Sequence, residues 1–131
     1  MIVDSSAVVA ILREEPESET FRRLISRSKP VRLSAGSYLE IGIVVDKDRD
    51  AELMRSLDDF IAGARITIEP VTERQARIAR DAYRDFGRGS GHPARLNFGD
   101  CLAYALAKEM AEPMLFKGDD FSRTDVRRAI S

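Results

Sequence analysis

The chain has 131 residues, of which 44% are hydrophobic and 33% charged, and its formal net charge is -1. This balance predicts one globular domain over residues 1–131 and gives no support for nucleic-acid binding through net charge alone. No apolar run approaches the ~18 residues of a membrane span, and acid and base come too early for a signal peptide. One Cys and one His exclude an internal disulfide and metal sites that need several such ligands, and a lone cysteine is typical of the reducing cytoplasm.

The first half of the chain predicts two short strands, each followed by a helix. Residues 1–4 predict a buried strand, and Ser5 or Ser6 is placed to cap a helix over residues 7–12. Pro16 fits the first turn of a second helix. A second strand is predicted at 31–34, with a helix from about Ala35 to Val45 after it.

The second half continues the alternation of helical and extended patterns. A polar connection over residues 46–50 leads into a helix, and Thr72 with Gln75 forms a capping-box pattern at the start of another. Residues 87–93 form a glycine-rich loop. The helical patterns cover residues 53–61, 72–86 and 98–110, and the extended ones cover residues 65–71 and 114–116, before residues 121–130 close the chain.

Alternating strands and helices predict the α/β class. We expect three α/β/α layers, with a central, mostly parallel sheet of four to five strands flanked by helices. In such folds ligands bind outside the carboxyl ends of the strands. The side chains that follow the predicted strands are therefore the first candidates for a functional site.

Four acids stand in apolar or glycine-rich surroundings near those strand ends. Asp4 and Asp119 follow predicted strands, Asp100 opens the apolar helix over 98–110, and Glu40 lies one to two turns into the helix after the second strand. Carboxylates are rarely buried unless they are paired or bind a cation. Their convergence at one edge predicts a site for Mg²⁺ or Mn²⁺, which prefer oxygen ligands and serve phosphoryl chemistry.

Each acid also has a simpler explanation. Asp4 could cap the first helix, although Ser5 and Ser6 offer capping groups of their own. Asp100 could be favoured by the dipole of its helix, and Asp119 with Asp120 could be turn residues after a glycine. The shared edge favours the metal site over these readings.

Four segments, in order and at suitable spacing, resemble the PIN-domain ribonucleases and, more closely, the VapC toxins of bacterial toxin–antitoxin pairs. The segments are Met1-Ile-Val-Asp-Ser-Ser-Ala-Val, Ser37-Tyr-Leu-Glu, Leu96-Asn-Phe-Gly-Asp-Cys-Leu-Ala-Tyr-Ala and Leu115-Phe-Lys-Gly-Asp-Asp-Phe-Ser-Arg-Thr-Asp. The resemblance implies a PIN fold and a Mg²⁺- or Mn²⁺-dependent endoribonuclease that cleaves structured RNA, such as tRNA or rRNA, to inhibit translation.

The resemblance also assigns roles to residues and partners. It implies that Asp4, Glu40, Asp100 and Asp119 bind the metal and act in catalysis, with Asp120 as the alternative to Asp119. Ser6 matches a hydroxyl that supports the first acid, and Asn97 matches a polar residue near the metals. The implied partners are RNA, a VapB-type antitoxin that contacts operator DNA, and a second copy in a homodimer, with no membrane.

Two basic residues beside the acid segments, Arg95 and Lys117, are candidates for holding substrate phosphates. Other functions stay open at this point: a PIN-like nuclease on another nucleic acid, a degenerate PIN scaffold without catalysis, or a phosphatase or phosphoacceptor domain. The haloacid-dehalogenase pattern would need a second Asp at position 6, where the chain has Ser.

Overall fold

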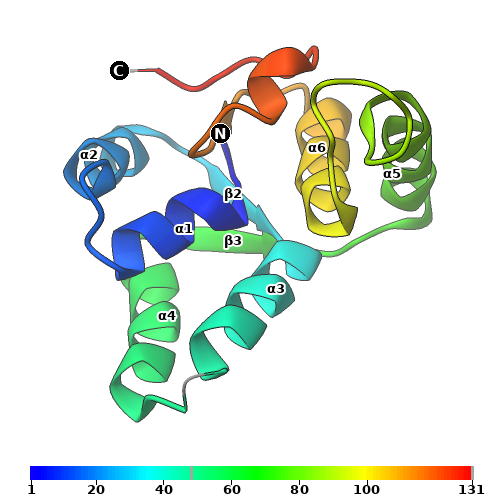
Figure 1. Ribbon diagram of the computed structural model, residues 1–131. Coiled ribbons are helices and arrows are strands. Elements are labelled where there is room, and N and C mark those ends of the chain that lie inside the picture. Colours follow the sequence, from blue (N-terminus) through cyan, green and yellow to red (C-terminus); the bar gives the residue numbers. More distant parts are fainter. Residues whose placement is uncertain (48, 131) are drawn as a thin grey trace.

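The computed structural model describes residues 1–47 and 49–130 and has a four-stranded parallel sheet at its centre (Figure 1). The strands lie side by side in the order β3-β2-β1-β4, and every pairing is parallel. Their bounds are β1 (Ile2–Val3), β2 (Val31–Ser34), β3 (Ile66–Glu69) and β4 (Met114–Leu115). The predicted strands at 1–4, 31–34, 65–71 and 114–116 are thus confirmed, each to within two residues at its ends.

Helices connect the strands and cover both faces of the sheet. They are α1 (Ser5–Leu12), α2 (Ser18–Arg27), α3 (Ala35–Asp46), α4 (Ala51–Gly63), α5 (Glu73–Phe86) and α6 (Phe98–Met110), and a short 3₁₀ helix, η1 (Phe121–Arg123), follows β4. The predicted helix over 98–110 has the bounds of α6. In the described part of the chain, no helix is long and apolar enough to cross a membrane.

Two apolar cores lie on opposite faces of the sheet, because alternate residues of a strand point to opposite sides. Val3, Leu33 and Leu115 belong to the core formed with α1, α2, α3 and α4. Ile2 and Met114 belong to the core formed with α5 and α6. Figure 1 shows α5 and α6 together on one side of the sheet, with α1, α2 and α4 on the other. The predicted three-layer α/β/α class is confirmed.

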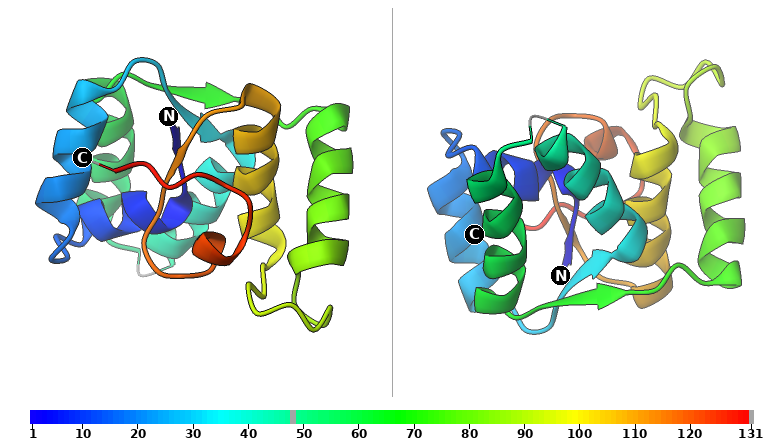
Figure 2. Two further views of the ribbon diagram at one scale, coloured as in Figure 1. Left: turned by 90° about the horizontal axis from the view of Figure 1, so that it is seen from above. Right: turned by 90° about the horizontal axis from the view of Figure 1, so that it is seen from below.

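The loop between α5 and α6 contains the predicted glycine-rich stretch and extends past the ends of both helices (Figure 2). It is anchored at both ends by backbone hydrogen bonds between Arg88 N–H and the Leu96 carbonyl and between Leu96 N–H and the Phe86 carbonyl. The polar connection expected over residues 46–50 includes residue 48, which lies outside the described residues.

Two predicted helix starts are wrong in detail. The cap of α1 is Asp4, not Ser5 or Ser6, because the helix begins at Ser5 and the Asp4 carboxylate accepts the Ser6 N–H. Pro16 precedes α2 instead of lying in its first turn, since that helix begins at Ser18.

The capping box predicted for Thr72 and Gln75 is half formed. The Thr72 hydroxyl accepts the Gln75 N–H at 3.1 Å, as expected. The Gln75 side chain is buried and donates to Glu109 Oε1 at 3.4 Å, so it does not return to the Thr72 backbone. A contact between α5 and α6 has therefore replaced the local one.

Candidate active site

Asp4 lies at the junction of β1 and α1, at the carboxyl edge of the sheet. Its backbone N–H donates to the Leu115 carbonyl at 2.9 Å, which ties it to β4. Its Oδ2 atom accepts the Ser6 N–H at 3.0 Å and caps α1, and the residue is only 2% exposed. The other carboxylate oxygen, Oδ1, is buried and has no hydrogen-bond partner among the described residues.

This burial raises the pKa of Asp4 to about 6, because a desolvated carboxylate is less stable as an anion. Hydrogen bonds from Ser6 lower the pKa, and the charge of Glu40 raises it. A buried oxygen without a donor is costly for the free protein. Asp4 therefore has one oxygen committed to the helix and one available for a cation.

Glu40 reaches the same edge from α3. Its Oε1 atom accepts a hydrogen bond from the Ser5 hydroxyl at 2.6 Å. Its carboxylate also lies directly against Gly99: a Cβ atom added at Gly99 would stand 2.0 Å from Glu40 Oε2. The carboxylate occupies space that exists only because residue 99 has no side chain.

Asp100 sits in the first turn of α6 and forms a complete capping box with Asn97. The Asn97 side chain accepts the Asp100 N–H at 2.8 Å, and Asp100 Oδ2 accepts the Asn97 N–H at 3.0 Å. Burial raises the pKa of Asp100 to about 7; the Asn97 hydrogen bond lowers it, and the charges of Asp4, Asp120 and Glu40 raise it. Three of the predicted acids, Asp4, Glu40 and Asp100, thus lie within Coulombic reach of one another.

Two adjacent acids, Asp119 and Asp120, follow β4. The charge that acts on Asp100 from this segment is that of Asp120. The Asp119 carbonyl accepts hydrogen bonds from the backbone N–H and the hydroxyl of Ser122, which start the turn into η1. Asp119 is the residue predicted from the sequence, with Asp120 as its alternative, and Asp120 is the one whose charge acts on Asp100.

The predicted supporting residues have unequal positions. Ser6 supports Asp4 through its backbone N–H, and its hydroxyl accepts the Lys117 N–H at 3.0 Å, which joins the end of β4 to α1. The Lys117 ammonium pairs with Glu15 at 2.5 Å and Glu17 at 3.3 Å, so its charge is partly neutralised. Arg95 is exposed and has a left-handed backbone, with φ of 50°.

Two positions at the site, Ser5 and Gly99, were not predicted as site residues from the sequence. Ser5 directly follows Asp4, so its place at the sheet edge could have been inferred from the start of α1. Gly99 carries no such signal, because its importance depends on the approach of Glu40 from another helix.

The acids offer the oxygen ligands that a hard cation prefers. Their carboxylates do not, however, lie close enough together to form a complete coordination shell. Within residues 1–47 and 49–130, no three His, Cys, Asp or Glu side chains are close enough to hold a metal ion as they stand. Ser5 holds Glu40, and the capping box holds one oxygen of Asp100. The unpartnered Asp4 Oδ1 and the mutual repulsion of the acids both fit a divalent cation with oxygen ligands.

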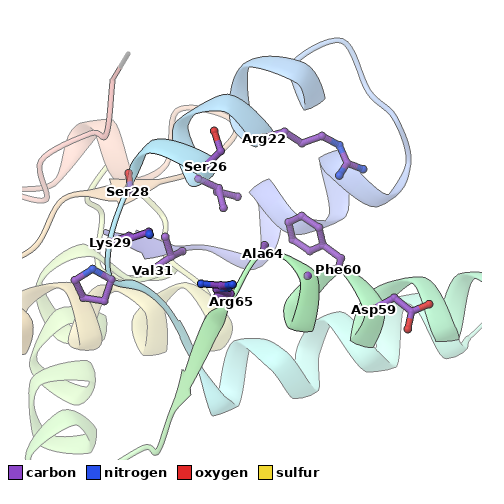
Figure 3. A pocket seen from close by; sticks show the side chains of 12 residues that line it. Arg22, Ser26, Ser28, Lys29, Val31, Asp59, Phe60, Ala64 and Arg65 are labelled. Atoms are coloured by element: carbon purple, nitrogen blue, oxygen red, sulfur yellow. The ribbon is translucent and has the colours of Figure 1, made fainter.

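A separate cavity of about 930 Å³ lies at the amino ends of β2 and β3, the edge opposite the acids (Figure 3). Its lining combines basic and apolar side chains with two serines and one acid, Asp59, and Arg22 stands over the Phe60 ring at 5.5 Å. Figure 3 shows Lys29 and Arg65 on either side of Val31. None of the acids predicted for the site lines this cavity, so the candidate active site is the carboxyl edge.

Comparison with known proteins identifies the family of the chain. The sequence model of the PIN domain matches residues 1–127. The chain is 58% identical to ribonuclease VapC28 of Mycobacterium tuberculosis over 130 residues, 99% of this chain and 98% of the relative. It is 46% identical to ribonuclease VapC42 of the same species, over 98% of both chains.

Two solved structures share the fold. The crystal structure of the Mycobacterium tuberculosis toxin VapC20, which cleaves the sarcin-ricin loop, matches with a TM-score of 0.74 and 17% identity, over 98% of this chain and 97% of that one. A toxin–antitoxin complex from Klebsiella pneumoniae matches with a TM-score of 0.68 and 11% identity, over 92% and 89%. The chain belongs to the PIN-domain family and, within it, to the VapC ribonucleases.

Proposed function

We propose that this chain is a metal-dependent endoribonuclease and the toxin of a toxin–antitoxin pair, with its active site at Asp4, Glu40, Asp100 and one acid of the pair Asp119 and Asp120. The observation that carries the proposal is the buried Oδ1 of Asp4, which has no hydrogen-bond partner in the described part of the chain and lies near two further acids. The membership of this chain among the VapC ribonucleases supports RNA as the substrate.

The donor set favours Mg²⁺ or Mn²⁺ as the cofactor. All the candidate ligands are carboxylate oxygens, which hard divalent cations prefer. Such a cation would stabilise the charge of a phosphodiester under attack and lower the pKa of the attacking water. Without it, an edge made of acids would repel an RNA backbone, so the cation would also strengthen the binding of the phosphate at the acids.

The chain's own residues orient the acids. Asp4 is fixed by the start of α1, Glu40 by the Ser5 hydroxyl, and Asp100 by its capping box with Asn97. Ser5 and Asn97 are positioning residues in this account, since each acts through an acid. The hydrogen bond from Lys117 N–H to Ser6 keeps the last acidic segment next to the first.

The proposed substrate is structured RNA, such as tRNA or rRNA, whose cleavage inhibits translation. The likeness to VapC28 and VapC42 supports this class, and the VapC20 fold match belongs to a toxin that cleaves an RNA loop. Such a substrate would be met in the cytoplasm, the location expected from the single cysteine.

The proposed protein partners are a VapB-type antitoxin, through which operator DNA would be contacted, and a second copy of the chain. The toxin–antitoxin complex among the similar structures supports an antitoxin. Leu39 and Ile43 are 63% and 62% exposed and lie four residues apart, on one face of α3. This exposed apolar face supports a homodimer formed through α3, which would bury it.

Cleavage of total tRNA and rRNA by the purified chain in Mn²⁺, Mg²⁺ or EDTA tests the proposal. Asp4→Asn is the sharpest variant, because Asn caps a helix as well as Asp does but removes the charge. We expect cleavage that depends on the metal and is lost in Asp4→Asn, while the variant stays folded. Metal-independent cleavage, or full activity in Asp4→Asn, would refute the proposed site.

A further inference from the structure

We propose that the cavity between α5 and the first turn of α6 binds a nucleobase of the substrate RNA, a subsite that rests on the ribonuclease function proposed above. The cavity has a volume of about 610 Å³, within the range of roughly 300–1,000 Å³ typical of ligand pockets. It is lined by Ala76, Ala79, Arg80, Tyr83, Arg88, Asn97, Phe98, Cys101 and Leu102.

The first argument is the exposure of two aromatic side chains that line this cavity. Phe98 is 79% exposed and Tyr83 is 46% exposed. Proteins that bind unpaired RNA stack its bases on exposed aromatic rings. Ala76 and Ala79 of α5 also line the cavity, and their small side chains leave room for a planar group.

The second argument is the charge at the rim. On α5, Arg77 pairs with Glu73, and Arg84 pairs with Asp81 and Asp85. By contrast, Arg80 and Arg88 line the cavity, and neither forms an ion pair with any residue in the described ranges 1–47 and 49–130. Two free guanidinium groups beside an apolar floor suit a nucleotide, whose base is planar and whose phosphate is anionic.

The third argument is the connection between this cavity and the proposed active site. Asn97 lines the cavity, and its side chain and backbone exchange hydrogen bonds with Asp100. Phe98, Gly99 and Asp100 all lie in the first turn of α6. Phe98 lines the cavity, and Gly99 lies against the Glu40 carboxylate. A base bound here would belong to a nucleotide close to the phosphate held at the acids, which makes the cavity a determinant of sequence preference.

An exposed apolar surface can also bind a second copy of the chain, so this partner competes with RNA for the α5–α6 cavity. The exposed pair on α3, Leu39 and Ile43, offers an apolar face without nearby arginines of its own helix. The α5–α6 cavity instead combines aromatic rings with free positive charge, which favours a polyanion that carries bases. We therefore assign the α3 face to the homodimer and the α5–α6 cavity to RNA.

The test measures RNA binding in EDTA, where metal-dependent cleavage does not interfere. Phe98→Trp introduces the only Trp of the chain, so its fluorescence reports on the cavity alone. We expect a short mixed-sequence oligoribonucleotide to quench this fluorescence and an abasic strand of equal length not to. For Phe98→Ala, we expect affinity for the base-bearing strand to fall roughly 5- to 100-fold and affinity for the abasic strand to be unchanged.

Ile130→Ala is the matched control, because Ile130 is 78% exposed and outside the cavity. Equal binding of base-bearing and abasic strands, or no quenching by either, would overturn the subsite. Light scattering on wild type and Phe98→Ala measures the remaining outcome. If wild type is a dimer and Phe98→Ala is a monomer whose base-dependent binding is intact, the cavity is a protein interface. Loss of cleavage in wild type with base-dependent binding retained would refute the nuclease proposal and not the subsite.

Discussion

Glu40 stands at the carboxyl edge because Gly99 leaves space for its carboxylate and Ser5 donates a hydrogen bond to it. Any side chain at residue 99 would collide with the flexible end of Glu40 before it met the backbone. The fold can absorb that collision by moving the carboxylate. The proposed active site cannot absorb the collision, because displacing a catalytic group by about 1 Å can lower the rate on the order of 100-fold.

Gly99→Ala is therefore expected to lower RNA cleavage by on the order of 10- to 100-fold without lowering the unfolding free energy. Gly42→Ala is the matched control, since Gly42 lies in a helix with no heavy atom within 4 Å of an added Cβ. It should stabilise the protein by about 0.5–1 kcal/mol and leave cleavage unchanged. Wild-type activity in Gly99→Ala would show that Glu40 has no role at its present position.

The two adjacent acids after β4 give a second prediction at this scale. Because the charge of Asp120 acts on Asp100, we expect Asp120→Asn to reduce cleavage more strongly than Asp119→Asn. Cleavage rates of the two variants, measured side by side in Mn²⁺, decide between them. The reverse order would restore the sequence-based choice of Asp119.

Sequence reasoning succeeded for residues with strong local signals and failed where distant segments compete for the same group. The helix over 98–110 was predictable because its apolar pattern is continuous. Gln75 was expected to cap its own helix, and its amide contacts Glu109 of α6 instead. The proximity of Asp4, Glu40 and Asp100 was expected from the parallel topology, whereas the approach of Glu40 to Gly99 depends on how α3 packs against α6.

Between elements, a group of charges joins β2, β3, the N-terminus and the segment after α6. The Arg32 guanidinium donates to Glu69 Oε1 at 2.7 Å and to Glu112 Oε2 at 2.9 Å, and Glu112 Oε1 accepts from the N-terminal amine. The Glu112 side chain is only 20% exposed. Its burial acts to raise its pKa, but the hydrogen bonds from the amine and from Arg32 outweigh burial, and the pKa of Glu112 is lowered.

A lowered carboxyl pKa in the folded state stabilises the protein above the pKa of the unfolded chain, and this contribution is lost as the pH falls through the folded value. Glu112→Gln should therefore reduce the unfolding free energy at pH 7 by about 1.5–3 kcal/mol. The difference from wild type should shrink as the pH drops below 4.5, the ordinary pKa of a glutamate side chain. Urea unfolding at a series of pH values measures both quantities.

Glu19→Gln is the control for this experiment, because Glu19 forms an exposed pair with Arg23 on α2. Exposed pairs contribute ~0–1 kcal/mol. A pH-independent effect of Glu112→Gln, or one no larger than that of Glu19→Gln, would contradict the structural role given to this group of charges.

Across the whole molecule, the parallel sheet brings acids from the beginning, middle and end of the chain to one edge. The two cores on its faces hold the strands in place, and helices α1, α3 and α6 each present an acid or its support there. This arrangement explains how a chain with a net charge of -1 can act on RNA: binding would depend on a local cation and a few free arginines, not on the charge of the molecule.

The most direct test of the account is a calorimetric titration of Mn²⁺ into the wild-type chain, Asp4→Asn and Asp59→Asn at neutral pH. Asp59 is an exposed acid of α4 that lines the cavity at the opposite edge. We predict saturable binding to wild type and Asp59→Asn, and a loss of at least about tenfold in affinity in Asp4→Asn. A flat titration of the wild type, or equal affinity in all three proteins, would contradict a metal site at the carboxyl edge.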